Sequence, residues 1–431
     1  MIRVNLWSIR VAIAIPSIAI CLFLIQLTAG IGFSRLLTTY ALTTNSIPAA
    51  DEAVRLSPSD PDAHRARATV LNRLGMHGEA AKSLEIATRL RSRDDLLWLE
   101  LGNTREELGD TQGALAALDQ AVRWAPFYAH THWQRGNLLL RMGRTAEAFT
   151  ELRQAAAVNR GYQPNLIDLA WSISRENLQT AEQLSGIKDD KDRLALMRFL
   201  AKKGKGREVV DQMRLLSAPL SRNAHDELVR LLFAAKDFKN AYELWVPAMY
   251  TQRTAAVFNR GFEDSTILNE PGFGGWVRSP AQNKVKLAID VNEKLDGAKS
   301  LQISFDGSLD PGVPLLSQTV LVEPAKTYPL SFGVKTKDLM TGAPLTITVN
   351  DALTNELLGK SENLPSGTTS WTKLQFDFTT LATSQAAVIR LQRSNCDSSP
   401  CPIFGTMWLD EVSIGPWIEE TATKTHKQHK S

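Results

Sequence analysis

Two of the three cysteines in this chain of 431 residues lie close enough in sequence to react with each other. Cys396 and Cys401 close the short loop Cys396-Asp397-Ser398-Ser399-Pro400-Cys401. In an oxidising compartment such a pair forms a disulfide, which stabilises so short a loop by roughly 2 kcal/mol. The alternative is a zinc site, but two thiols without a nearby histidine supply too few ligands. We therefore predict a disulfide between these two cysteines.

Motifs for catalysis are lacking in the sequence. The seven histidines are scattered, and His130 and His132, two residues apart on a helix, point to different faces. Gly359-Lys360-Ser361 is similar to the end of a phosphate-binding loop, but Thr354 stands where the first glycine is required. No Gly-x-Ser-x-Gly elbow occurs, and no carboxylate pair is singled out as a glycosidase site. We predict that the protein is not an enzyme and requires no cofactor.

The composition is that of a globular protein with more than one domain. Of the residues, 43% are hydrophobic and 22% are charged, and the formal net charge is +3. A length of 431 residues allows two or three domains with cores of their own. A basic stripe with interleaved aromatic residues is missing, and basic residues gather only in a tail at 419–431 that we predict to be disordered. This pattern argues against nucleic-acid binding.

A period of 34 residues dominates the first half of the chain. The segments 61–94, 95–128 and 129–162 each contain two helix-period patterns separated by a glycine. In the middle segment the positions that recur are Trp98, Leu101, Gly102, Gly109, Ala114, Leu118, Ala121 and Pro126. They resemble the tetratricopeptide repeat, in which Gly or Ala lets two helices cross closely. The other two segments have His64 and His132 where the large aromatic residue is expected.

The helical pattern continues on both sides of the three clear repeats. Residues 46–60 resemble half a repeat and are expected to cap the array. Two further helical hairpins are predicted at about 191–216 and 222–246, where the strict period is lost. We therefore predict a solenoid of helices over 46–250.

The resemblance to tetratricopeptide repeats implies a protein-binding groove. In stacked repeats of this kind the first helix of each unit lines the concave face. The residues that we single out in this register are Arg73, Asn103, Trp133, Asn137 and Arg141. Asn103 and Asn137 occupy equivalent positions and suit pairing with the main chain of an extended peptide, and Trp133 suits an apolar anchor. The alternative is that these residues are ordinarily solvated and that a neighbouring segment covers Trp133.

From residue 255 on, the pattern changes to short alternating runs separated by Gly, Pro, Asn and Asp. We predict strands at 284–291, 300–306, 315–322, 327–335, 345–350, 372–378, 386–392 and 407–414. About eight strands over this length are typical of an all-β sandwich or jelly roll. The predicted fold class is therefore multidomain, with a helical solenoid followed by a β-sandwich at 255–418.

Short motifs at both ends of the predicted sandwich resemble those of jelly-roll carbohydrate-binding modules. Asn259-Arg260-Gly261-Phe262-Glu263 is similar to their first strand, and Trp408-Leu409-Asp410-Glu411-Val412 is similar to their last. The resemblance implies a structural calcium with Glu263 and Asp410 as its carboxylate ligands. The alternative is that both are surface or capping carboxylates.

The same resemblance implies contact between the sandwich and a glycan. Phe273, Trp276 and Phe404 lie in predicted loops and would form a face on which sugar rings stack. Trp371 and Trp408 lie in predicted strands and are expected in the core. The alternative is that the loop aromatics are buried as plugs of the sandwich.

An uncharged run at 11–33 is long enough to cross a bilayer as one helix. Arg3 and Arg10 precede this run and Arg35 follows it, so the positive-inside rule places residues 1–10 in the cytoplasm. We predict a single-pass protein of the inner membrane whose bulk is periplasmic. The alternative is a signal peptide that is cleaved.

These features together predict a scaffold. The layout resembles membrane-anchored repeat proteins of bacterial envelope and exopolysaccharide systems, which implies partner proteins in such an assembly. We predict that the repeats bind those partners and that the sandwich contacts polysaccharide. The alternative function is an envelope glycan-active enzyme, or its accessory subunit, with an active site that no motif identifies.

Overall fold

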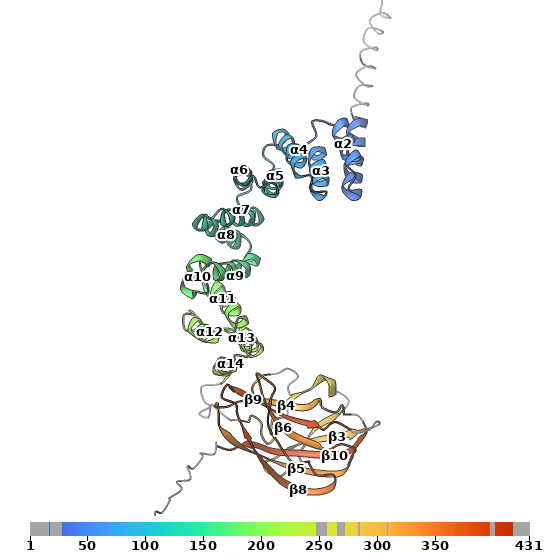
Figure 1. The fold of residues 1–431 in the computed structure, drawn as a ribbon, viewed down its shortest axis with the longest axis vertical. Helices are drawn as coiled ribbons and strands as arrows, with labels where there is room; N and C mark the ends of the chain where they lie inside the picture. Colours follow the sequence, from blue (N-terminus) through green and yellow to red (C-terminus); the bar gives the residue numbers. More distant parts are fainter. Residues whose placement is uncertain are drawn as a thin grey trace, which may run out of the picture. The chain divides into compact units, whose positions relative to one another are not determined.

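The computed structural model describes residue 17 and residues 28–246, 257–264, 272–282, 285–307, 309–396 and 401–416 (Figure 1). The chain divides into two compact units, residues 1–188 and residues 189–431. The first unit is helical where it is described, and the second joins helices to two β-sheets. Helices followed by an all-β sandwich, the coarser part of the predicted fold class, are confirmed.

Paired helices make up the first unit. Residues 28–44 are helical and precede α2 (Ile47–Leu56), α3 (Pro61–Arg73), α4 (His77–Leu90), α5 (Asp95–Glu107), α6 (Thr111–Trp124), α7 (Ala129–Arg141), α8 (Thr145–Val158), η1 (Arg160–Tyr162), α9 (Gln163–Ile173) and α10 (Leu178–Ser185). Each clear repeat is one hairpin, formed by α3 and α4, by α5 and α6, or by α7 and α8. Gly75, Gly109 and Gly143 occupy the turns with φ of 76°, 78° and 76°, a conformation that favours glycine. The predicted period is therefore a period of helical hairpins.

Close helix crossings explain the small residues of the repeats. A Cβ atom on Gly102 would lie 2.8 Å from Leu118 Cγ, and one on Gly136 would lie 2.7 Å from Leu152 Cγ. Leu118 and Leu152 are themselves fully buried. A glycine at each crossing thus lets the second helix of the hairpin pack directly on the first.

One hydrogen bond explains why histidine replaces tryptophan in two of the repeats. The indole N–H of Trp98 donates to the carbonyl six residues earlier in the chain, at 2.8 Å. The Nε2–H groups of His64 and His132 donate to the equivalent carbonyls at 2.9 and 2.8 Å. A ring N–H is therefore the shared requirement at this position, and both residue types supply it.

The second unit begins with helices and continues as a sandwich. Its helices are α11 (Asp190–Lys202), α12 (Gly206–Met213), α13 (Arg222–Ala234) and α14 (Phe238–Trp245), and η2 (Pro280–Gln282) is a short turn of helix. The first sheet contains, in spatial order, β1 (Val277–Arg278), β4 (Pro314–Leu321), β9 (Ala386–Arg393), β6 (Leu345–Asp351) and β7 (Leu357–Lys360). The second sheet contains β2 (Lys286–Asp290), β3 (Ser300–Asp306), β10 (Ile403–Ile414), β5 (Thr327–Thr341) and β8 (Gly367–Thr379). Neighbouring strands pair antiparallel.

The core of the sandwich lies between its two sheets. Ile347 and Ile389 of the first sheet and Ile303 and Leu409 of the second sheet belong to one buried cluster and are at most 1% exposed. Along each strand such residues alternate with side chains on the opposite face, as a two-residue period requires. One face of each sheet is therefore left to contact solvent, helices or a ligand.

Aromatic rings join α13 and α14 to the sandwich. The Phe273 ring lies 5.3 Å from that of Phe233 in α13 and 5.1 Å from that of Tyr242 in α14, measured between centroids. Trp245 packs edge-on against Phe258 at 4.7 Å. We call these five residues the aromatic joint. Gly274, with φ of 95°, is part of this fit, because a Cβ atom there would lie 2.4 Å from the indole of Trp245.

The chain divides into compact units at a different place from the expected one. The sequence predicts one helical array over 46–250 and a separate sandwich over 255–418. Instead, α11 to α14 belong to the same compact unit as the sandwich, and the division falls at residue 188. The rings of the aromatic joint contribute contacts between α13, α14 and the residues that precede β1.

The predicted anchor at 11–33 lies largely outside the described residues. The predicted cytoplasmic segment 1–10 and the predicted tail 419–431 lie outside them entirely. Where the structure describes the chain, no helix has both the length and the apolar character needed to span a bilayer. The anchor therefore stays a prediction.

Candidate functional site

A hollow of about 550 Å³ lies beside α3 and α5, the first helices of two neighbouring repeats. Its lining includes two of the predicted groove residues, Arg73 and Asn103. Arg73 donates to the carbonyl of Leu42 at 2.7 Å and to the Asn45 side chain at 3.0 Å, so it also fixes the preceding turn. The Asn103 amide is half-buried and makes no hydrogen bond with any described residue.

The other three predicted groove residues lie on α7. Trp133 stacks on Tyr162, with ring centroids 4.8 Å apart and an angle of 25° between the planes. Arg141 forms an ion pair with Glu106 of α5. The Asn137 amide is half-buried and has no hydrogen-bond partner within the described ranges. A neighbouring segment thus covers one face of Trp133, while the Asn137 amide is available to a ligand.

Glu263 and Asp410, the predicted calcium ligands, both bind the backbone of one loop. Glu263 Oε1 accepts hydrogen bonds from two N–H groups of the loop 295–299, at 2.7 and 3.2 Å. Asp410 Oδ2 accepts from two others, at 2.8 and 3.2 Å. Burial raises the pKa of Asp410, and the Glu263 carboxylate raises it further.

Both carboxylates therefore act as caps in this structure. Among the described residues, no group of three or more His, Cys, Asp or Glu side chains is placed to hold a metal. Ca²⁺ takes six to eight oxygen ligands, so these two residues do not form a complete site by themselves. The calcium stays a prediction.

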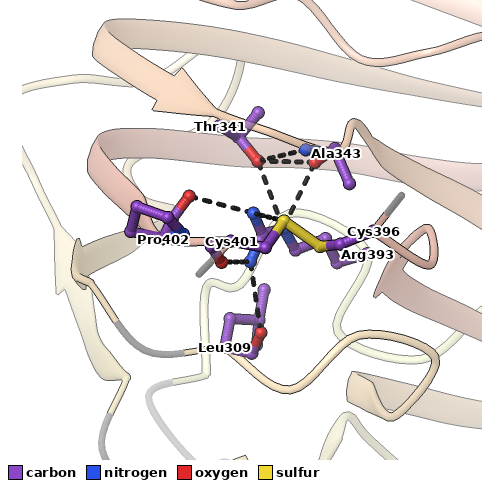
Figure 2. Close-up of a disulfide and its surroundings, with 7 residues drawn as sticks. All are labelled: Leu309, Thr341, Ala343, Arg393, Cys396, Cys401 and Pro402. Atoms are coloured by element: carbon purple, nitrogen blue, oxygen red, sulfur yellow. Dashed lines mark hydrogen bonds between the residues drawn. A yellow bond between two sulfur atoms is a disulfide. The ribbon is translucent and has the colours of Figure 1, made fainter. Parts of the chain in front are cut away.

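The predicted disulfide between Cys396 and Cys401 is confirmed. Figure 2 shows Arg393 beside it, a residue that is fully buried. Its guanidinium donates to the carbonyls of Leu309, Ala343, Cys401 and Pro402 and to the hydroxyl of Thr341. Burial lowers the pKa of Arg393. Because the acceptors are neutral backbone and side-chain groups, we regard this Arg393 clasp as a structural cross-link.

Two of the three predicted glycan-contact residues are wrongly assigned. Phe273 is 4% exposed and belongs to the aromatic joint. Trp276 is 1% exposed and stacks on Phe262 in the core, with ring centroids 5.6 Å apart. Neither presents a face to a ligand, so the plug interpretation holds for both. Phe404 is 43% exposed on β10 and stays a candidate.

The face of the first sheet that points away from the core is polar. Its side chains alternate with core residues such as Ile347 on β6 and Ile389 on β9. We call it the outer face, and its members include Ser317, Thr319, Thr346, Thr348, Asn350 and Arg390. Strand pairing sets Ser317, Arg390 and Thr348 in one row across β4, β9 and β6.

A pocket of about 680 Å³ lies between the outer face and the helices α13 and α14. Phe233 and Phe238 line it from the helices, and Ser317, Thr319 and Arg390 line it from the sheet. Thr319 is only 7% exposed. The side chains of Ser317, Thr319 and Arg390 make no hydrogen bond or ion pair in the part of the chain that the structure describes. We call this cavity the outer-face pocket.

Polar atoms next to the pocket also lack partners. Thr348 Oγ1 and Asn350 Oδ1 are buried on the outer face without a hydrogen bond. Buried polar atoms nearly always have a protein or water partner, so such a cluster calls for a water or ligand to satisfy it. The outer face therefore has hydrogen-bonding capacity that the protein itself does not use.

Sequence reasoning missed the outer-face pocket. The sequence contained one signal: Thr, Asn and Arg occupy outward positions of β6 and β9. A strand that only faces solvent accepts any polar residue at such positions. The helical side of the pocket gave no signal in the sequence. Phe233 and Phe238 were assigned to the helical array, and no local pattern indicates that their helices cover a sheet.

Comparisons with known proteins agree with these two architectures. A family model described as a carbohydrate binding domain matches residues 254–398, and a tetratricopeptide repeat model matches residues 97–128. One helical hairpin of the chain is therefore similar to a tetratricopeptide repeat, and the sandwich is similar to a carbohydrate binding domain. The predicted resemblances to both families are confirmed at this level.

Curated relatives match a limited part of the chain. The tRNA(Glu)-specific nuclease WapA of Bacillus subtilis subsp. natto is 31% identical over 161 residues, which are 35% of this chain and 7% of that protein. The tRNA nuclease WapA of Bacillus subtilis strain 168 is 29% identical over 161 residues, which are again 35% of this chain and 7% of that protein. The chain therefore spans about 7% of the length of the relatives that it matches.

Solved structures of both kinds are similar to parts of the chain. The MamA protein is 15% identical, covering 46% of this chain and 98% of that one, with a TM-score of 0.32. YrrB, a TPR protein with an unusual peptide-binding site, is 18% identical, covering 48% and 90%, with a TM-score of 0.28. A CBM4 structure is 12% identical, covering 37% and 99%, with a TM-score of 0.29.

Proposed function

We propose that this protein is a scaffold that binds partner proteins through its repeats and carbohydrate through the outer face of its sandwich. The predicted anchor at 11–33 would hold it in the inner membrane with both binding regions outside the cytoplasm. Partners in an envelope or exopolysaccharide assembly fit this arrangement. Catalysis forms no part of the proposal, and assays of glycan cleavage by the full chain test that point.

The outer-face pocket carries the carbohydrate part of the proposal. It combines buried and half-buried hydrogen-bonding groups that have no partner in the described residues with the aromatic rings of Phe233 and Phe238. Sugars offer hydroxyl groups and apolar ring faces, which need this combination. The match of residues 254–398 to a carbohydrate binding domain supports the same assignment.

Thr319→Val in the full chain tests the carbohydrate part. The substitution removes one hydroxyl of the pocket without changing the shape of the side chain. We expect an unchanged Tm and an affinity for glycan that falls about three- to tenfold, the value of one hydrogen bond. Isothermal titration against oligosaccharides selected on a glycan array measures it. Thr372→Val on the exposed β8 is the matched control, and equal losses in both variants would refute the assignment.

The unpartnered amides of Asn103 and Asn137 support the protein-binding part of the proposal. They occupy the same position in successive repeats, on α5 and α7. A side-chain amide offers both a donor and an acceptor, which matches the main chain of an extended peptide. Trp133 and Arg141 lie on the same helix and would add apolar and charged contacts.

Capture of partners from a membrane extract tests this groove. The double variant Trp133→Ala with Asn137→Ala should lose the proteins that the unchanged chain retains. Arg222→Ala, at a side chain that is 94% exposed on α13, is the control. An unchanged set of captured proteins from the double variant would show that the groove is not the contact surface.

A structural calcium at Glu263 and Asp410 completes the proposal. It would relieve the repulsion that the buried Asp410 carboxylate meets from Glu263, and backbone carbonyls would supply the remaining oxygens. We expect added calcium to raise Tm and a chelator to lower it. A Tm that changes neither with added calcium nor with a chelator would contradict the structural calcium.

A further inference from the structure

This inference rests on the proposed function and concerns the charge of the glycan. Arg390 of β9 lines the outer-face pocket, in the strand row that also holds Ser317 and Thr348. Its side chain is half-buried and makes no hydrogen bond or ion pair within the described residues. A cation that is partly withdrawn from water and unpaired is unfavourable, so an anion that binds it gains more than at an exposed arginine.

Arg393 shows how the same strand satisfies a buried guanidinium. It is fully buried, and four carbonyls, one hydroxyl and the Cys401 sulfur accept its hydrogen bonds (Figure 2). Arg390, three residues earlier, has no such set of acceptors. Burial lowers the pKa of Arg390, but an arginine remains protonated in a protein. The pocket therefore holds a full positive charge that is left uncompensated.

The other charged group that lines the pocket is also positive. Arg278 lines it, and its guanidinium donates to the carbonyl of Gln282 at 3.0 Å. Lys236, in the turn between α13 and α14, donates to the carbonyl of Leu353 at 3.1 Å, next to the pocket. No Asp or Glu is among the described residues that line the pocket. Among the residues that line the pocket, an anionic ligand would therefore meet two cations and no carboxylate.

We propose that the outer-face pocket binds an acidic sugar, a hexuronate residue of a polysaccharide, whose carboxylate pairs with Arg390. A planar guanidinium binds a planar carboxylate through two parallel hydrogen bonds. Ser317 and Thr319 bind ring hydroxyls of the same residue, and Phe233 covers an apolar face of the sugar. The pocket volume of about 680 Å³ is of the size that small ligands occupy.

Isothermal titration of the full chain in detergent tests the proposal. The probes are oligogalacturonate, oligomannuronate and hyaluronan fragments, the methyl ester of each, and neutral cello-, xylo- and laminari-oligosaccharides. We expect an acidic probe to bind, its methyl ester to bind at least tenfold more weakly, and affinity to fall as salt rises. Arg390→Met should weaken acidic binding roughly ten- to hundredfold, and Arg390→Lys should restore part of it.

Two controls separate loss of charge from loss of fold. Lys373→Met on the exposed β8 removes a cation from the other sheet and should change nothing. The Tm of Arg390→Met should not fall, because no described contact is lost. One outcome would overturn the acidic ligand and keep the proposed function. In that outcome only neutral probes bind, and their affinity falls in Thr319→Val but does not change in Arg390→Met. Binding of sulfated chondroitin with no preference for carboxylates would also overturn the acidic sugar. If no probe binds, both this proposal and the proposed function are refuted.

Discussion

At the scale of single residues, Arg393 is the most informative feature of the sandwich. Its guanidinium links the end of β9 to β5, to the loop after β3 and to the disulfide loop through neutral acceptors. A buried charge of this kind is tolerated only because its donors are satisfied together. The clasp therefore fixes the end of β9 together with the disulfide beside it.

Replacement of Arg393 by methionine tests this clasp. The carbonyls of Leu309, Cys401 and Pro402 would lose their buried donor, so the free energy of unfolding should fall by about 1–3 kcal/mol or more. Urea denaturation followed by tryptophan fluorescence measures the change. Arg222→Met, at an exposed arginine in the same unit, should have no effect. Equal stability of the two variants would contradict the role of the clasp.

Asp351 gives the sandwich a pH dependence of known sign. It is 1% exposed, and although burial opposes its charge, the Ser384 hydroxyl and the amides of Thr354 and Leu353 outweigh burial and lower its pKa. A carboxyl with a lowered pKa contributes stability above its unfolded value of about 3.9, and this stability is lost as the pH falls through the folded value. Asp351→Asn should lower Tm at neutral pH, and the difference from the parent chain should shrink in acid. A difference in Tm that does not depend on pH would contradict this account.

Single residues were predicted from the sequence where chemistry is local. The disulfide between Cys396 and Cys401 needed only their spacing. The burial of Phe273 and Trp276 was only the alternative interpretation, because it depends on which helix and which sheet lie over each ring. His64 and His132 were seen as departures from the repeat, although the hydrogen bond that they share with Trp98 makes them equivalent.

At the scale of elements, the helix crossings of the repeats leave no room for a side chain larger than that of glycine. Gly136→Ala would place a Cβ atom 2.7 Å from Leu152 Cγ and 3.1 Å from the carbonyl oxygen of Ala148. The hairpin of α7 and α8 must then open, at a cost of about 1–3 kcal/mol. Circular dichroism during thermal unfolding measures the loss of helix. Gly78→Ala in α4, where a Cβ atom meets nothing within 4 Å, is the control and should not lower Tm.

Eight of the ten described strands were predicted, and their places were predicted better than their extents. The period of two located β3, β6 and β9 almost to the residue, because apolar residues alternate there without interruption. β5 runs to Thr341, beyond the predicted end at 335, since its last part carries polar residues and the positive φ of Asp338. The short β7 was missed because its Gly359 and Lys360 gave no alternation to detect.

At the scale of the whole molecule, the aromatic joint packs α13 and α14 against the residues at the start of the sandwich. Phe273→Ala would remove a ring that is 4% exposed and that touches both α13 and α14. We expect a loss of about 3 kcal/mol and faster amide hydrogen exchange in α13 and α14, with no change in α3 to α8. Phe404→Ala, at an exposed ring, is the control. Unchanged exchange in α13 and α14 would show that the joint does not hold the helices.

The sequence predicted both kinds of architecture but not their division. Periodicity of 34 residues and of two residues reports which elements form, and both periods are visible without any structure. Neither reports that Phe233 and Phe238 belong beside a sheet whose strands begin some forty residues later. For the same reason the sequence did not predict the outer-face pocket, because that pocket forms only where α13 and α14 lie beside the sheet.

The double role of the α13–α14 hairpin limits how this protein can change over evolutionary time. Arrays of repeats lengthen and shorten by duplication or loss of whole hairpins, and a hairpin gained or lost within 61–162 leaves the outer-face pocket intact. Loss of α13 and α14 would instead remove Phe233 and Phe238 and open that pocket. We therefore expect related chains to differ in the number of their early repeats, while the last hairpin keeps a constant distance in sequence from the first strand.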